Sequence, residues 1–460
     1  MTQLSVARRV ARFVTGLALE DLPPAVVSRT ILLALDTLGS CLASSTMDFG
    51  RAVILTADRL GGPPESSLIG GKAKVAAANA VLANGTLAHG LDFDDTREDA
   101  IVHTGSVAVA TALAAGEAVG ASGRSAVEAM IAGVEVMCRV GLAVPGKFHA
   151  RNFHPTALAG SFAAAAAAGK LYGLTEDQLV HAFGICGSQA SGIIQYLADG
   201  SWTKRLHPGW AAHAGVVAAA LAQAGFTGPE SVFEGRQGFY QAFAGDYDQG
   251  RMDPLLESLG KVWEVEHLTF KPYPCGSIAH PYMDCALRLR AQHAIRPDQI
   301  AEVHCRTAEG PVPRLWEPLT TKRQPPNGYA AKFSLPYLVA VILVKGRAGL
   351  TEFTDEAVQD TTVLDVAARV HYDLDPSIDY PRQFVGHVRI RLTDGRVVEE
   401  RQDHPRGGPD FSMSREELEA KFRGNAGLRM PAEKIEEVIN AVSGLAALRE
   451  LAPLMTTLRL

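Results

Sequence analysis

The sequence has little of three things: cysteine, net charge and uninterrupted apolar stretches. Lys and Arg total 44 against 50 Asp and Glu, so the formal net charge is only −6 over 460 residues. Neither a basic domain nor a basic tail is present, which argues against a nucleic-acid or membrane-surface binder. The most apolar stretch, residues 337–344, is too short to span a bilayer, so no membrane span is expected. With 47% hydrophobic residues, the chain is still long enough to bury a large core.

Six cysteines are scattered along the chain without a C-x-x-C pair. This usage argues against a disulfide framework and predicts a reducing cytoplasm. It also argues against an iron–sulfur cluster or a structural zinc, whose thiolates usually come from close local spacings. No G-x-G-x-x-G opens a strand–helix unit, and no P-loop or G-x-S-x-G turn is present. The sequence therefore argues against an iron–sulfur cluster, a structural zinc and a redox cofactor.

Helical periodicity dominates the chain up to about residue 267. Apolar residues recur at i, i+3 and i+4 in segments that Gly and Pro separate, namely 4–17, 22–44, 75–88, 106–119, 126–142, 156–171, 176–189 and 211–224. Beyond Pro274 strand patterns appear, and Val388, Ile390 and Leu392 alternate with charged residues before a turn at Asp394-Gly395. The predicted fold is mainly α: a discontinuous all-helical domain of residues 1–267 and 409–460, and a smaller α+β lid domain of residues 268–408.

The densest polar cluster is His89-Gly-Leu-Asp-Phe-Asp-Asp-Thr96, which is followed by His103. Three carboxylates within four residues repel one another, so one should have a raised pKa if the site is enclosed. A carboxylate near neutrality beside a histidine suits proton abstraction. Two alternatives remain open: solvated helix-end acids with Asp95 as an N-cap, or a Mg²⁺ site.

Three cationic segments each precede an expected helix start. They are Lys147–Thr156 with His154-Pro155, Ser201–Trp210 with Lys204, Arg205 and His207, and Lys271–Pro281 with Cys275 and His280. A helix N-terminus and nearby cations together favour a bound anion. The plainer interpretation is capping histidines, an exposed basic loop and a buried, inert thiol.

These segments together resemble the MmgE/PrpD family along almost the whole chain. The resemblance rests on His89–Thr96, Asn152-Phe-His-Pro-Thr156, Lys204-Arg-Leu-His-Pro-Gly209 with Gly225-Phe-Thr-Gly-Pro229, and Lys271-Pro-Tyr-Pro-Cys275 with His280. It implies a helical domain built from both termini, a smaller lid, a homodimer and catalysis without metal or cluster. The substrate implied is a small polycarboxylate.

The resemblance also implies site residues. Carried over by motif, Asp92, Thr96, His103, His154, Lys204 and His280 would be catalytic. Asp92 or His103 is expected to transfer the proton, while substrate carboxylates are expected at Lys204, His154, His280, Lys271 and Arg205. The positive charge of such a site would come from Lys204, the histidines and the helix ends.

The activity expected from the resemblance is that of a cofactor-independent hydro-lyase, like the 2-methylcitrate dehydratase of propionate metabolism. Decarboxylation of cis-aconitate or epimerisation of iminodisuccinate is the alternative. Two departures from the family pattern favour dehydration over decarboxylation: His103 is followed by Thr104 rather than Pro, and residues 310–318 hold no Tyr. Rival classes are a Mg²⁺-dependent prenyl-type synthase, whose second acidic cluster is badly spaced at Asp246-Tyr-Asp248, and a non-catalytic helical interaction protein.

Overall fold

The computed structural model describes residues 4–380 and 382–460. It divides into two compact units, one that runs to Leu268 and takes in Ser414–Leu460, and one of Thr269–Met413. The predicted domain boundaries lie at residues 267/268 and 408/409. The prediction of a mainly α protein with a smaller α+β part is confirmed, since the strands are few and short.

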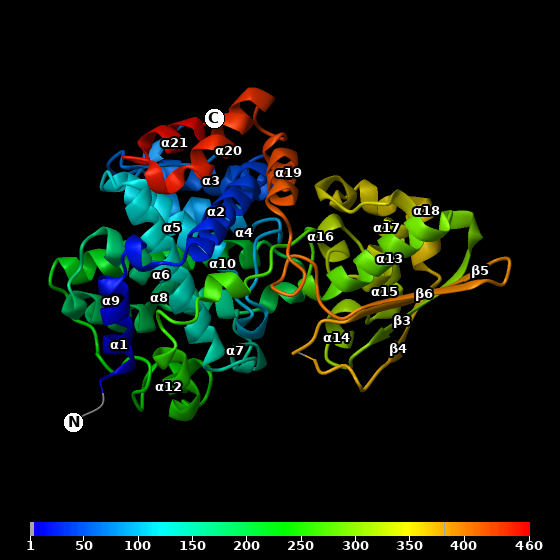
Figure 1. The fold of residues 1–460 in the computed structure, drawn as a ribbon, viewed down its shortest axis with the longest axis horizontal. Helices are drawn as coiled ribbons and strands as arrows, with labels where there is room; N and C mark the ends of the chain where they lie inside the picture. The colour runs from blue at the N-terminus through cyan, green and yellow to red at the C-terminus, as the bar shows by residue number, and fades with distance from the viewer. Residues whose placement is uncertain (1–3, 381) are drawn as a thin grey trace. The chain divides into compact units, whose positions relative to one another are not determined.

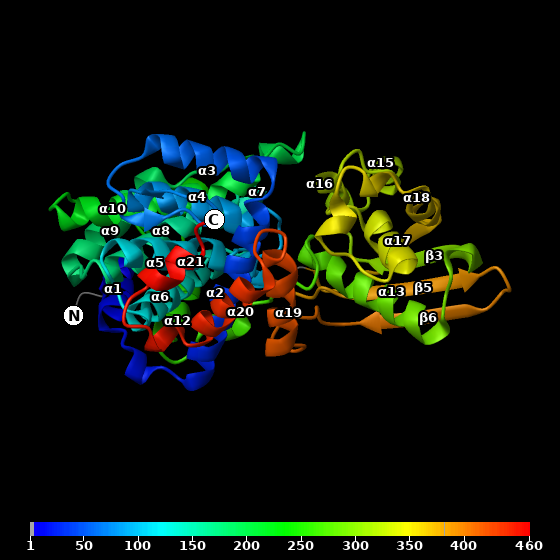
Figure 2. The same ribbon diagram turned by 90° about the horizontal axis from the view of Figure 1, so that it is seen from above.

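The first unit is a bundle of helices with one small two-stranded sheet (Figure 1). Its helices are α1 (Val6–Gly16), α2 (Pro24–Ser44), α3 (Asp48–Leu60), α4 (Ala77–His89), α5 (Gly105–Ala118), α6 (Gly123–Leu142), α7 (Lys147–Ala150), α8 (Pro155–Leu171), α9 (Glu176–Gln189), α10 (Thr203–Gln223), α11 (Phe239–Phe243), α12 (Gln249–Glu257), α19 (Arg415–Ala426), α20 (Ala432–Ser443) and α21 (Ala452–Thr457). The small sheet pairs β1 (Ser66–Ser67) with β2 (Lys74–Val75). The C-terminal helices α19 and α20 contact α2, and α21 contacts α5, so both ends of the chain build this unit (Figure 2).

Small residues hold the central helices close together. The residues of α8 from Pro155 to Gly169 are all buried, and eight of them are alanines. Gly209 of α10 lies against α4, where an added Cβ would come within 2.1 Å of the Leu82 carbonyl oxygen. Only small side chains let helix backbones approach so closely.

One helix of the described residues, α2, is long and apolar enough to cross a membrane. Within the fold, 72% of its 18-residue apolar window is buried. It contacts α4, α5, α19 and α20. This burial among other helices is typical of a core helix, in line with the expectation of no membrane span.

The second unit is a four-stranded sheet with helices packed on it. The strand order is β4 (Val370–Leu374), β3 (Ile300–Thr307), β5 (Gly386–Leu392) and β6 (Val397–Gln402), with β3 and β4 parallel and the other pairs antiparallel. The helices are α13 (His280–His293), α14 (Val312–Leu315), α15 (Leu319–Arg323), α16 (Gly328–Ala331), α17 (Leu335–Lys345) and α18 (Thr361–Ala367). Val388 and Ile390 of β5 belong to a buried core that they share with residues of α13 and α17.

The largest difference from the sequence prediction is the start of α10. Pro208-Gly209 suggested a break, so a helix was expected from Ala211, but α10 begins at Thr203 and Pro208 lies inside it. A proline in the early turns of a helix costs few backbone hydrogen bonds, and Gly209 is needed for the contact with α4. Lys204 and His207 therefore lie on the first turns of a helix and not on a loop ahead of it.

Candidate active site

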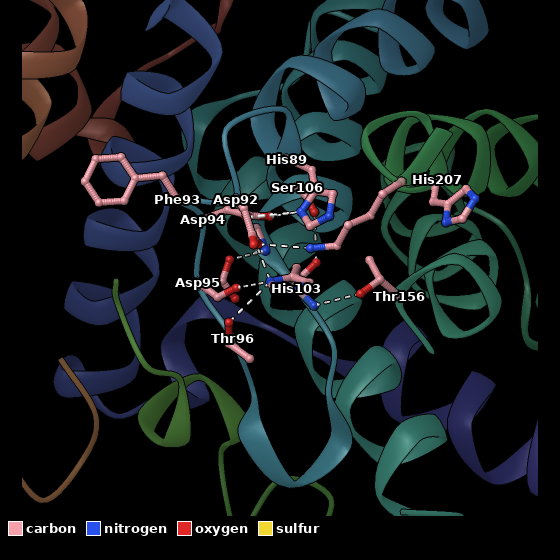
Figure 3. A network of polar contacts seen from close by, with 12 residues as sticks. His89, Asp92, Phe93, Asp94, Asp95, Thr96, His103, Ser106, Thr156 and His207 are labelled. Atoms are coloured by element: carbon pink, nitrogen blue, oxygen red, sulfur yellow. Dashed lines mark hydrogen bonds and ion pairs between the residues drawn. The ribbon is translucent and has the colours of Figure 1, made fainter. Parts of the chain in front are cut away.

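The candidate site is built on the connection between α4 and α5. His89 is the last residue of α4, and Thr104 caps α5. Between them the chain turns back through an isolated antiparallel bridge between Arg97 and Val102. This short excursion brings His103 back beside the end of α4, where its ring centroid lies 4.6 Å from that of His89 (Figure 3).

The backbone of this connection is strained at Asp92, whose φ is +55°. A non-glycine residue in the left-handed region costs free energy, and such residues cluster at functional sites. Ile101, two residues before His103, and Asn152, two residues before His154, are also left-handed, with φ of +56° and +65°. The site histidines are thus held in place by a backbone that the surrounding fold constrains.

The three carboxylates of the cluster have three different partners. Asp92 lies 3.1 Å from the Lys204 ammonium of α10. Asp94 lies 2.8 Å from Nδ1 of His89. Asp95 accepts from the backbone N–H and the hydroxyl of Thr104 and from the N–H of Gly105, at the N-terminus of α5. Asp95 therefore accepts hydrogen bonds at the N-terminus of α5, as the helix-capping alternative supposed, but it is buried and not solvated, and the N-cap residue of α5 is Thr104.

The predicted raised carboxyl pKa is found at Asp95. Burial, reinforced by repulsion from Asp94, raises the pKa of Asp95 to about 7, although its hydrogen bonds to Thr104 and Gly105 oppose the shift. The expectation of an enclosed, self-repelling acid cluster is confirmed, since the three aspartates are at most 3% exposed. Because the Asp95 carboxylate accepts from the backbone at the N-terminus of α5, this perturbed group stabilises the backbone of the site.

Five of the residues predicted from the sequence converge here. Asp92, Thr96, His103, His154 and Lys204 are all buried, at 2–8% exposure. Nδ1 of His103 lies 2.8 Å from the Asp95 carbonyl oxygen and 3.3 Å from the Thr96 hydroxyl, while its backbone N–H donates to Thr156 (Figure 3). The ring of His154, at the start of α8, lies 5.7 Å from that of His89 and 6.1 Å from that of His103. Side chains from segments far apart in the sequence thus lie close together in one buried cluster.

The other three predicted residues lie elsewhere. The Arg205 guanidinium lies over the Phe49 ring, 4.3 Å from its centroid. Lys271 and His280 belong to the second unit, where both are buried and His280 Nε2 lies 3.2 Å from the Cys275 carbonyl oxygen. Their part in substrate binding stays a prediction.

Two histidines of the site carry no positive charge at neutral pH. Burial, and then the nearby His89 and Lys204 side chains, keeps the pKa of His154 well below 6.5 and lowers that of His207 to about 4. Their Nδ1 atoms lie 3.1 Å apart, so one of them donates and the other accepts. The expectation that all the histidines add positive charge is wrong for these two, because an imidazolium cannot be solvated there. Lys204 supplies the cation.

Three residues of the quoted motifs have a role in the site that the sequence did not predict. His89 and Asp94 form a buried pair but were not among the predicted site residues. His207, also passed over, is the partner of His154. The spacing of His89 and Asp94, five residues across a helix end, was the available signal, since such a distance lets a side chain fold back on the last turn.

A metal ion is the alternative use of this cluster. One nitrogen or oxygen atom each from His89, Asp92, Asp94 and His103 lies within 4.8 Å of the others, and the same holds for His89, His103 and His154. These are acceptable donors for a divalent cation. The Lys204 ammonium against Asp92 already compensates one of the carboxylates and repels a second cation. The electrostatics therefore favour an anionic substrate over a metal.

Comparison with known families and proteins agrees with the motifs. The MmgE/PrpD N-terminal domain matches residues 8–251, and the MmgE/PrpD C-terminal domain matches residues 273–445. The chain belongs to the MmgE/PrpD family. The C-terminal match extends into α19 and α20, which pack with the helical unit.

Relatives of the chain include named enzymes that align over nearly its full length. Cis-aconitate decarboxylase of Aspergillus terreus is 26% identical over 477 residues, covering 98% of this chain and 96% of the relative. Cis-aconitate decarboxylase of Homo sapiens is 28% identical over 470 residues, covering 99% and 95%. That of Mus musculus is 28% identical over 466 residues, covering 99% and 93%.

Proposed function

We propose that this protein is a lyase that acts on a small polycarboxylate by acid/base chemistry, without a metal or a redox cofactor. The observation that carries the proposal is the buried cluster in which the Lys204–Asp92 ion pair lies among the rings of His89, His103 and His154. A cation is needed to hold a substrate carboxylate, and neutral imidazoles are needed to move a proton. The names of the relatives support the same substrate class.

Within this class, two reactions are candidates. The sequence favours elimination of water, as in a 2-methylcitrate dehydratase, because residues 310–318 hold no Tyr. The relatives favour loss of CO₂ from cis-aconitate. Both reactions require a cation against a carboxylate and one proton transfer at the neighbouring carbon, so the same cluster serves either of them.

The test is incubation of the purified protein with 2-methylcitrate, citrate, cis-aconitate and iminodisuccinate, each with and without a chelator. Proton NMR of the products distinguishes loss of water, loss of CO₂ and epimerisation. Turnover of at least one compound that persists with the chelator is expected. Turnover of none would contradict the proposed function and favour a non-catalytic role, and loss of turnover on chelation would contradict the metal-free chemistry.

We further propose that the protein is cytoplasmic and a homodimer. All six cysteines are unpaired and buried, which suits a reducing compartment. The dimer rests on the family resemblance, and light scattering on a sizing column tests it. A mass of 48.9 kDa in solution would contradict it.

A further inference from the structure

His89 is held by a carboxylate in a buried and fixed orientation. Nδ1 of His89 lies 2.8 Å and 3.1 Å from the two carboxylate oxygens of Asp94. The side chain of His89 is 1% exposed and that of Asp94 is fully buried. In such a buried pair no water competes for the hydrogen bond between imidazole and carboxylate. The ring of His89 therefore has one orientation.

The partner of Nδ1 decides which tautomer His89 adopts. A carboxylate only accepts, so Nδ1 carries the proton and Nε2 carries a lone pair. Among the described residues, Nε2 of His89 is buried and has no hydrogen-bond partner. A buried polar atom without a partner is rare and costs free energy, so it calls for a functional explanation.

The other histidines of the site are bound differently. His103 uses Nδ1 against the backbone carbonyl of Asp95, and it lies 3.8 Å from Asp94. His154 and His207 share one proton between their Nδ1 atoms. Among the histidines of this cluster that the structure describes, His89 differs from the others because its ring nitrogen lies within hydrogen-bond distance of a carboxylate. A carboxylate stabilises the imidazolium that forms when Nε2 takes up a proton, which a carbonyl does less well.

We propose that His89 is the residue that transfers the proton at the substrate carbon, with Asp94 as its positioning residue. The proposal rests on the proposed function and replaces the expectation that Asp92 or His103 has this role. It leaves Asp92 to hold Lys204, and His103 to donate to or accept from the substrate.

Elimination of water takes place through two proton transfers. Nε2 of His89 takes the proton from the carbon beside a substrate carboxylate, and the C–H electron pair becomes the new C=C bond. The C–O bond to the neighbouring hydroxyl breaks, and the hydroxyl takes a proton from the Lys204 ammonium and leaves as water. Asp94 neutralises the imidazolium until it returns its proton to solvent. For loss of CO₂, Nε2 of His89 first takes up a proton from solvent. The C–C bond to the carboxylate then breaks, its electron pair stays on carbon as CO₂ leaves, and the imidazolium delivers its proton to that carbon.

Two variants test the atoms separately. His89→Asn keeps an N–H where Nδ1 donates to Asp94 but lacks Nε2. Asp94→Asn offers an amide that donates to Nδ1, which forces the proton onto Nε2 and removes the basic lone pair. Asp99→Asn is the matched control, because Asp99 lies on the same connection and is half-exposed.

For His89→Asn we expect kcat to fall at least ~100-fold with KM changed only a few-fold, as for loss of a general acid or base. Asp94→Asn should lower kcat ~10-fold or more, while Asp99→Asn leaves kcat unchanged. A kcat within ~5-fold of wild type in His89→Asn would overturn the proposal.

Nitrogen NMR of protein labelled at the histidine rings tests the proposal without any substrate. The His89 signals, assigned by their loss in His89→Asn, should show a protonated Nδ1 and an unprotonated Nε2 in wild type, and the reverse in Asp94→Asn. A protonated Nε2 in wild type would overturn the proposal even in a variant series that folds poorly. If the wild type turns over none of the four compounds, the proposed function fails, and a correct tautomer would still support a proton-transfer role for His89.

Discussion

Helix α19, near the C-terminus, stabilises the candidate site through Lys421. Replacing this residue should therefore destabilise the protein. Nζ of Lys421 lies 2.6 Å from an Asp36 carboxylate oxygen of α2, and donates at 2.7 Å to the carbonyl oxygen of Phe93. It also lies 3.9 Å from the centroid of the Phe93 ring. Phe93 stands between Asp92 and Asp94, so Lys421 holds the backbone on which both carboxylates depend.

The size of the expected loss in unfolding free energy follows from the burial of both charged side chains. The Lys421 side chain is 6% exposed and that of Asp36 is 1% exposed. Removing one partner of a buried pair leaves the other charge without compensation, which costs ~3–5 kcal/mol. Lys421→Met keeps the length of the side chain and removes its charge, so we expect a loss of about 3–5 kcal/mol in the unfolding free energy. Since the Phe93 carbonyl also loses its donor, we expect the carboxylates to shift and kcat to fall ~10-fold or more.

The assay is urea unfolding followed by far-UV circular dichroism, with the double variant Lys421→Met/Asp36→Leu as the decisive comparison. Replacing both charges by apolar groups should recover most of the stability, because no buried charge is left. Lys434→Met on the exposed face of α20 is the control. A Lys421→Met protein within ~1 kcal/mol of wild type would refute the reasoning, as would a double variant whose loss equals the sum of the single losses.

Three further predictions concern charge and packing around the same site. Because the pKa of Asp95 is about 7 in the fold against ~3.9 when unfolded, its contribution to stability is present below pH 3.9 and lost as the pH rises to 7. Between pH 4 and 7, the unfolding free energy of Asp95→Asn relative to that of wild type should therefore rise by up to roughly 4 kcal/mol in urea titrations. A difference between the two proteins that does not change with pH would count against this. The pKa of His207 is lowered to about 4, so its contribution is present above pH 6.5 and lost as the pH falls toward 4. His207→Gln should reduce the loss of unfolding free energy at acid pH by up to about 3 kcal/mol. An unfolding free energy that falls equally with pH in variant and wild type would contradict this. Gly209→Ala should destabilise the protein by ~1–3 kcal/mol, since the new Cβ would meet the Leu82 carbonyl oxygen at 2.1 Å, while Gly424→Ala, which meets nothing within 4 Å, should be neutral or stabilising in thermal unfolding.

Local sequence was enough for the elements whose signals are local. Thr175 and Gln178 form a capping box, a local pattern that can be read in the sequence, and α9 spans the predicted residues 176–189. The alternation in β5 and the turn into β6 are also found, because a strand with one buried face must alternate. The start of α10 was mistaken, since Pro208 and Gly209 look like a break in a local window and make sense only against α4.

For the candidate site too, the sequence predicted some features and the tertiary structure decided the others. The sequence by itself placed His89, Asp92, Asp94 and His103 in one short segment, which determined that acid/base groups lie close together at a helix end. The tertiary structure decided the pairing: Lys204 with Asp92 across 112 residues, His154 with His207 across 53, and Lys421 with Phe93 across 328. It also decided which groups are charged, since a pKa depends on burial and on neighbours that other segments supply. Periodicity tells which face of a helix is buried, but not what it is buried against.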